Sequence, residues 1–246
     1  MNKEEIKKLE ATLWYTADTL RANSDLKSSE YSTPVLGLIF LKFADNKYSL
    51  VEDEIKGEFN KLKGSRRERK IEEIALEKCG FYLPPEARYD YLLNLPEKED
   101  LASAIKKAMQ AIENFKPELA DTLPQDEYFR LNRRKDGNKD VLDNTTLIRL
   151  LKNFADIPKT AGGDMFGQIY EYFLGKFAMA EGQGGGEFFT PRSVVRLMVQ
   201  IIEPHNGTVF DPACGSGGMF VQSAQFIDER KTPGDDTSLF VYGSEK

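Results

Sequence analysis

The sequence is poor in the residues that build disulfides and zinc sites. Its 246 residues include two cysteines, Cys79 and Cys214, and one histidine, His205. Two separated cysteines provide no disulfide framework, and with one histidine they do not make a credible zinc site. Low cysteine content is also typical of a reducing compartment, so we predict a cytoplasmic protein with no metal site.

No stretch of the sequence is long and apolar enough to cross a bilayer. The longest apolar run, 35–43, contains Lys42 and is far shorter than the roughly 20 residues that a membrane helix needs. Residues 1–10 are charged, unlike a secretory signal. The net charge of −6 excludes polyanion binding through overall charge, so contact with nucleic acid would need a local basic patch or a partner.

Apolar residues recur at helical spacing through most of the chain before residue 180. Asn2 and Glu5 form a possible capping pair for the first helix, and Thr33-Pro34 is expected to start the second. The second helix is apolar nearly all round and is expected to be buried at the centre. An aromatic stripe in the last segment favours core packing over base stacking. The expected helices are 3–22, 34 to about 59, 86–95, 99–115, 145–156 and 165–180.

Two basic clusters, 61–70 and 130–139, could contact phosphates or could be solvated surface. The polar segment 131–143 predicts a loop near a domain boundary. The glycine-rich segment 181–186 predicts either a hinge that a ligand orders or a plain linker.

A strand, a glycine turn and a helix are predicted between residues 208 and 227. Asp211 ends the strand, Gly215 and Gly217 allow a tight turn, and apolar residues from Met219 begin the helix. This arrangement brings free N–H groups of a helix to the end of a parallel strand, where a ligand can bind. Phe220 stands where a nicotinamide fingerprint needs its third glycine, and no Walker lysine follows the glycines.

The acids at the strand ends indicate a different ligand. Asp211 suits a ligand with positive charge and hydrogen-bond donors, such as S-adenosylmethionine. Glu245 follows the next apolar strand, 239–243, where an acid can bind ribose hydroxyls. Upstream, Thr190 is expected to cap a helix and Pro191 to lie in its first turn; the N-terminus of this helix could receive a carboxylate.

Three motifs together resemble the adenine-N6 DNA methyltransferases, and more narrowly the modification subunit of type I restriction–modification systems. They are Glu187-Phe188-Phe189-Thr190-Pro191, then 211–218, then Glu245. The resemblance covers the whole chain. It implies a mostly α chain, with an N-terminal helical domain over 1–143. The truncated start of a Rossmann-like α/β S-adenosylmethionine-dependent methyltransferase domain follows over 144–246.

The resemblance also implies roles for single residues. Asp211 would hold the methionine part of S-adenosylmethionine, Gly215 and Gly217 would allow close backbone approach, and Glu245 would bind the ribose. Thr190, with Phe188 or Phe189, would border the methionine end. The expected cofactor-binding residues are Glu187, Phe188, Phe189, Thr190, Pro191, Asp211, Pro212, Ala213, Gly215, Ser216, Gly217 and Glu245. Cys214 is interpreted as small-residue packing and His205 as a surface residue.

The expected partners are DNA, a DNA-specificity subunit and a nuclease-translocase restriction subunit, with no membrane. Members of the family bind the flipped adenine with an Asn/Asp-Pro-Pro-aromatic tetrapeptide, which this sequence lacks. The nearest match, 83–86, reads Leu-Pro-Pro-Glu and lies in the helical domain. We therefore expect an inactive N-terminal portion of a longer enzyme, with an exposed sheet edge that favours self-association.

Two other functions stay open. One is a non-catalytic helical assembly or DNA-contact module with a remnant of the cofactor site. The other is a methyltransferase that acts on RNA or protein.

Overall fold

A computed structural model describes residues 3–22, 28–96, 98–130, 144–159, 163–180, 190–215, 217–232 and 238–245. They form two compact units, Met1–Phe177 and Ala178–Lys246. The polar segment 131–143, the glycine-rich segment 181–186 and Asn2 lie outside the described residues.

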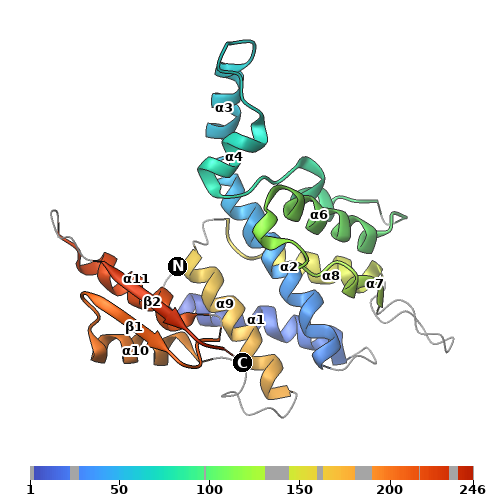
Figure 1. Cartoon of the computed structure of the whole chain (residues 1–246). Helices are drawn as coiled ribbons and strands as arrows, with labels where there is room; N and C mark the ends of the chain where they lie inside the picture. The colour runs from blue at the N-terminus through green and yellow to red at the C-terminus, as the bar shows by residue number, and fades with distance from the viewer. Residues whose placement is uncertain are drawn as a thin grey trace. The chain divides into compact units, whose positions relative to one another are not determined.

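The first unit is helical (Figure 1). Two short 3-10 helices, η1 (Pro85–Ala87) and η2 (Pro117–Leu119), flank its longer helices. The α-helices are α1 (Lys3–Ala22), α2 (Ser28–Ser49), α3 (Glu52–Leu62), α4 (Ile71–Cys79), α5 (Tyr89–Leu93), α6 (Leu101–Phe115), α7 (Glu127–Arg130), α8 (Asn144–Ala155) and α9 (Gly163–Ala180). No helix of the described residues is long and apolar enough to span a membrane.

Helix α2 lies in the core of this unit, as its apolar sequence predicts. Val35, Leu38 and Ile39 are completely shielded from solvent, and α2 contacts α1, α3, α5, α7 and α8. Burial of such side chains stabilises the fold by roughly 1.5–3 kcal/mol each.

The aromatic stripe of α9 packs into the same core. The ring of Phe173 is fully buried, with its centroid 5.4 Å from that of Trp14 and 5.8 Å from that of Phe154. Both pairs have edge-to-face geometry, which aromatic side chains prefer in protein cores. The interpretation of this stripe as core packing is therefore confirmed.

The predicted start of α2 is wrong. The helix begins at Ser28, and Pro34 lies inside it rather than at its first turn. A proline inside a helix removes one backbone hydrogen bond. Tertiary contacts offset this cost: the Tyr31 hydroxyl donates to the carbonyl of Ala17 at 3.0 Å, and the Tyr128 hydroxyl donates to the carbonyl of Pro34 at 3.0 Å.

The structure divides the chain after Phe177, whereas the sequence predicts a division after residue 143. The difference arises because α8 packs against α1, α2, α5 and α6 in the first unit.

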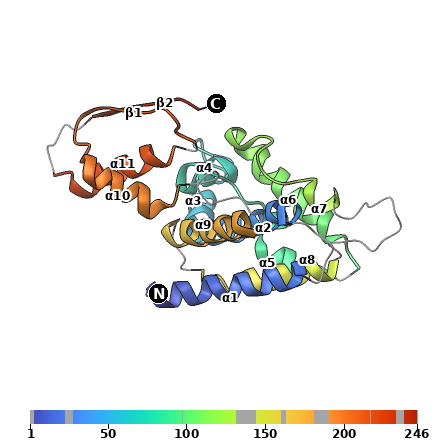
Figure 2. The ribbon, with the colours of Figure 1, turned by 90° about the horizontal axis from the view of Figure 1, so that it is seen from below.

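The second unit contains α10 (Arg192–Ile202), β1 (Gly207–Asp211), α11 (Gly218–Arg230) and β2 (Leu239–Gly243). The two strands are parallel, with Gly207 opposite Leu239 and Asp211 opposite Gly243. Figure 2 shows α10 and α11 on one side of this two-stranded sheet. The β1–α11–β2 order matches the start of a Rossmann-like domain, so the predicted fold class is confirmed.

A small core joins the two helices of this unit. Val195, Val199 and Phe226 are buried, and Met219 and Ile227 pack against them. The strands carry an exposed apolar surface: Phe210 is 64% exposed, and Phe240 and Tyr242 are each 60% exposed.

Candidate functional site

The turn after β1 begins with a hydrogen bond from a backbone N–H to the side-chain carboxylate of Asp211. The backbone N–H of Ala213 donates to Oδ1 of Asp211 at 3.1 Å. Aspartate commonly forms such a turn with the N–H two residues later, and this fixes its side chain at the strand end. Asp211 is half-buried, while Pro212 and Ala213 are exposed.

Two glycines then reverse the chain into α11. Gly215 and Gly217 have φ angles of 51° and 82°, which glycine adopts without steric cost. The carbonyl of Gly217 accepts hydrogen bonds from the N–H groups of Phe220 and Val221 at 3.0 and 3.2 Å, which starts the helix. Among the described residues, a Cβ on Gly215 or Gly218 would meet no atom within 4 Å, so these residues leave the space beside the turn open.

The residues that follow β2 form hydrogen bonds with this glycine turn. The N–H of Gly215 donates to Oε2 of Glu245 at 2.6 Å. Backbone bonds flank this contact: the N–H of Ser244 donates to the carbonyl of Asp211 at 2.9 Å, and the N–H of Cys214 donates to the carbonyl of Ser244 at 3.0 Å. The structure thus brings Asp211, Gly215 and Glu245 together at the carboxyl end of two parallel strands.

Cys214 fills space beneath the turn. A Cβ on Gly243 would lie 2.6 Å from Sγ of Cys214 and 3.0 Å from Cε2 of Phe220. Cys214 is therefore packed against Gly243, which agrees with its interpretation as a small packing residue. Sequence reasoning missed Gly243; the Tyr-Gly pair at the end of the second apolar run is the signal that could have revealed it.

The residues upstream of α10 are only partly described. Thr190 and Pro191 are exposed at the start of this helix. The capping prediction for Thr190 is wrong because the N-cap position belongs to Pro191, whose carbonyl accepts hydrogen bonds from Val194 and Val195 at 2.9 and 3.1 Å. Four predicted site residues lie outside the described residues: Glu187, Phe188, Phe189 and Ser216.

His205 is exposed, as predicted, with its ring centroid 5.7 Å from that of Phe226.

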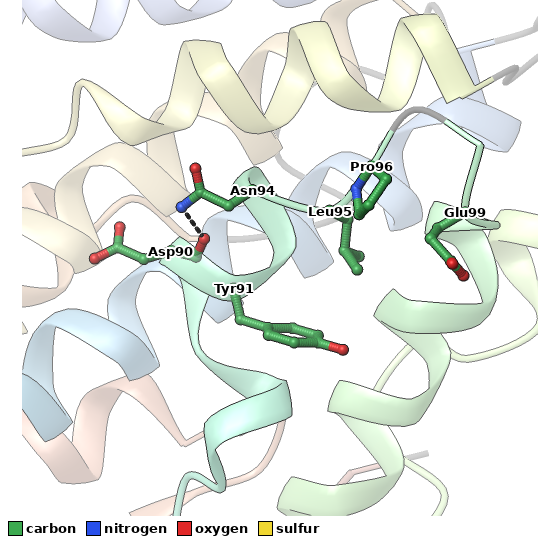
Figure 3. Close-up of a pocket in the computed structure, with 6 residues that line it drawn as sticks. All are labelled: Asp90, Tyr91, Asn94, Leu95, Pro96 and Glu99. Atoms are coloured by element: carbon green, nitrogen blue, oxygen red, sulfur yellow. Dashed lines mark hydrogen bonds between the residues drawn. The ribbon is translucent and has the colours of Figure 1, made fainter.

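A separate hollow of about 550 Å³ lies in the first unit (Figure 3). Asp90 and Tyr91 line it from α5, Asn94 follows directly after this helix, and Leu95, Pro96 and Glu99 complete the lining. The Asn94 amide donates to the backbone carbonyl of Asp90 at 2.7 Å. Two carboxylates on its wall disfavour a phosphate ligand, so this hollow does not suit DNA or a nucleotide phosphate.

Two family matches divide the chain between residues 154 and 161. Residues 9–154, more than half of the chain, match the HsdM N-terminal domain. Residues 161–246 match the N-6 DNA methylase family.

Several type I methylase subunits are similar to this chain. It is 33% identical over 249 residues to the type I restriction enzyme MjaIX methylase subunit of Methanocaldococcus jannaschii, with 96% of this chain and 42% of the relative covered. It is 31% identical over 184 residues to the HindI methylase subunit of Haemophilus influenzae, with 75% and 39% covered. The chain thus spans about two-fifths of the length of these curated relatives.

A solved structure shares the fold. The crystal structure of the type I restriction-modification system methyltransferase subunit from Streptococcus thermophilus matches with a TM-score of 0.66 at 23% identity. The match covers 98% of this chain and 52% of that chain.

The chain has a helical domain followed by a strand, a glycine turn, a helix and a parallel strand. This is the fold of a DNA methylase subunit with a helical N-terminal domain. The chain belongs to the HsdM family, the modification subunits of type I restriction–modification systems.

Proposed function

We propose that this chain binds S-adenosylmethionine as part of a type I modification subunit that methylates N6 of adenine in a specific DNA site. The observation that carries the proposal is the hydrogen bond from Gly215 to Glu245, with Asp211 at the end of the adjacent strand. This donor and acceptor set fits the cofactor: the carboxylates can accept from ammonium and hydroxyl groups, and the open side of the turn leaves room for the ligand.

Each site residue has a proposed task. The Asp211 carboxylate binds the methionine part of the cofactor, directly or through water. One oxygen of Glu245 holds the turn and the carboxylate faces the ribose hydroxyls. Gly215 and Gly217 let the backbone approach the ligand closely. Thr190 at the start of α10 borders the methionine end, together with Phe188 or Phe189.

Bound S-adenosylmethionine supplies a methyl group already activated by its sulfonium. The task of the protein is therefore mainly to align this group with the adenine nitrogen. The 246 residues contain no Asn/Asp-Pro-Pro-aromatic tetrapeptide for holding the base. We infer that these residues provide the cofactor side of the site and give no methylation by themselves.

The relatives are named as subunits of type I restriction enzymes, which supports a role in a complex. We propose that a specificity subunit reads the DNA sequence and that a nuclease-translocase subunit joins for restriction, in the cytoplasm.

The test is a methylation assay on the protein in its complete type I complex. Duplex DNA is incubated with S-adenosylmethionine labelled in the methyl group, digested to nucleosides and separated. Label in N6-methyladenine is the expected result. Label in methylcytosine, or no label in a complex that binds both DNA and cofactor, would contradict the proposal.

A further inference from the structure

The helical hairpin of α3 and α4 ends in a strongly basic loop. Residues 61–70 contain six lysines and arginines and one glutamate, in a chain whose net charge is −6. Figure 1 shows the two helices extending away from the other helices of the first unit. Five of the six basic side chains, here called the basic tip, are exposed: Lys61, Lys63, Arg66, Arg67 and Lys70.

The loop that carries the basic tip has a fixed backbone. The carbonyl of Leu62 accepts hydrogen bonds from the N–H and the hydroxyl of Ser65 at 3.0 and 2.7 Å. The Ser65 hydroxyl in turn accepts from the N–H of Arg67 at 3.2 Å. Gly64, with a φ of 74°, donates its N–H to Oε2 of Glu68 at 3.2 Å. These bonds hold the basic side chains on an ordered turn.

The two helices of the hairpin, here called its stem, are linked by ion pairs of other charged side chains. Arg69 pairs with Glu77 at 2.7 Å and with Glu58 at 3.6 Å, and so links the two helices. Lys78 pairs with Glu58 at 3.1 Å. The acids of the stem therefore engage Arg69 and Lys78 rather than the basic tip.

At the base, Arg88 fixes the hairpin to the rest of the unit. Its guanidinium pairs with Glu52 at the start of α3 at 2.7 Å and with the buried Asp45 of α2 at 2.6 Å. Ile55 of α3 and Ile74 of α4 are also buried in the main core. The basic tip is thus held at the end of an anchored arm.

The charge of the basic tip does not stabilise the fold. Across the residues that the structure describes, none of its five cations forms an ion pair. Like charges in one loop repel each other, and Lys70 precedes the positive end of the α4 dipole. An anionic partner would remove this repulsion.

We propose that the basic tip contacts the phosphate backbone of duplex DNA. Residues 61–70 include no aromatic side chain on which an unpaired base could stack, which favours a duplex over single-stranded nucleic acid. Contacts from lysine and arginine to phosphates add affinity without reading sequence. The choice of DNA rests on the proposed function, and the contact gives a DNA-binding surface to a chain whose total charge is negative.

The test is the salt dependence of duplex binding by the whole chain. The probe is a fluorescent 30-base-pair duplex of arbitrary sequence, titrated between about 50 and 200 mM salt. The variant carries Lys63→Gln, Arg66→Gln and Arg67→Gln. A matched control carries Lys8→Gln, Arg149→Gln and Lys152→Gln, which remove the same charge from exposed side chains of α1 and α8. Circular dichroism establishes that both variants retain the wild-type helix content.

The expected result is a loss of about tenfold or more in affinity at low salt for the tip variant alone. The slope of log affinity against log salt should fall by about 0.9 for each phosphate contact that is lost. Equal affinities for tip variant and control, or no duplex binding by the wild type at low salt, would overturn the proposal. Unchanged DNA affinity with lost binding of a partner subunit would also overturn it, and would assign the basic tip to an acidic protein surface.

Binding of S-adenosylmethionine by the same preparations separates this proposal from the proposed function. If the cofactor binds and the basic tip proves irrelevant to DNA, only the DNA contact is refuted. If the basic tip binds DNA and the cofactor does not bind, only the proposed function is refuted.

Discussion

The backbone N–H of Gly215 donates a 2.6 Å hydrogen bond to the carboxylate of Glu245, although thirty positions separate the two residues. The bond joins the turn after β1 to the end of β2. It follows from the parallel register, which pairs Asp211 with Gly243 and so places the following residues of both strands side by side. The acid at one strand end thereby shapes the turn at the other.

Gly243→Ala should destabilise the second unit by about 1–3 kcal/mol, the usual cost of overpacking. The added Cβ would lie 2.6 Å from Sγ of Cys214 and 3.0 Å from Cε2 of Phe220. Urea unfolding measures the change. Gly218→Ala is the control because its Cβ would meet no atom of the described residues within 4 Å. Adding Cys214→Ala to Gly243→Ala should restore part of the lost stability; no rescue would refute this packing relationship.

Gly37→Ala should destabilise the helical unit by a similar amount. Its Cβ would collide with the Tyr128 hydroxyl, and it would lie 2.5 Å from Cγ of Pro124. Gly57→Ala is the matched control within α3, since its Cβ would meet nothing within 4 Å in the part of the chain that the structure describes. Alanine is favoured over glycine inside a helix, so the control should gain roughly 0.5–1 kcal/mol. Thermal unfolding that moves both variants in the same direction would contradict this account.

Lys42 gives the helical unit a stability that depends on pH. It is 3% exposed, its Nζ lies 5.0 Å from the ring centroid of Tyr89, and burial lowers its pKa despite the nearby carboxylates of Asp45 and Asp90. The unfolded chain therefore binds more protons than the folded chain between the lowered pKa and about 10.5, so the free energy of unfolding rises with pH in that window. The cost of burying the charge is complete below the lowered pKa.

Lys42→Met removes this cost and should raise the free energy of unfolding at neutral pH by about 1 kcal/mol. Asp45 retains Arg88 and Asp90 retains Lys159 as partners in the variant. Urea unfolding at several pH values should show the advantage of the variant shrinking as pH rises toward 10.5. An advantage that stays constant or grows with pH would disprove the linkage.

Local sequence patterns were sufficient to predict most of the helices. The periodic apolar residues of 3–22 form α1, and the apolar segment around Leu38 and Ile39 forms the buried part of α2. The early start of α2 could not be predicted in this way. It depends on Tyr31 and Tyr128, whose partners are far away in the sequence.

The candidate site was predictable to the extent that a strand–turn–helix pattern fixes which residues meet. The pattern predicts Asp211, Gly215 and Glu245 at one end of the sheet, and the structure brings them together. The hydrogen bond between Gly215 and Glu245 cannot be predicted from the order of the two strands alone, because it also requires their register. The packing of Gly243 against Cys214 depends on the same register.

Calorimetric titration of the chain with S-adenosylmethionine tests the central claim most directly. Asp211→Asn and Glu245→Gln keep an oxygen that can accept from the turn but remove the charge, so each should weaken binding by about tenfold or more. The exposed Asp228→Asn and Glu229→Gln of α11 are the matched controls and should bind as the wild type does. Binding by the wild type that is weakened only by the first pair is the predicted result. No binding, or equal affinities for all four variants, would contradict the account.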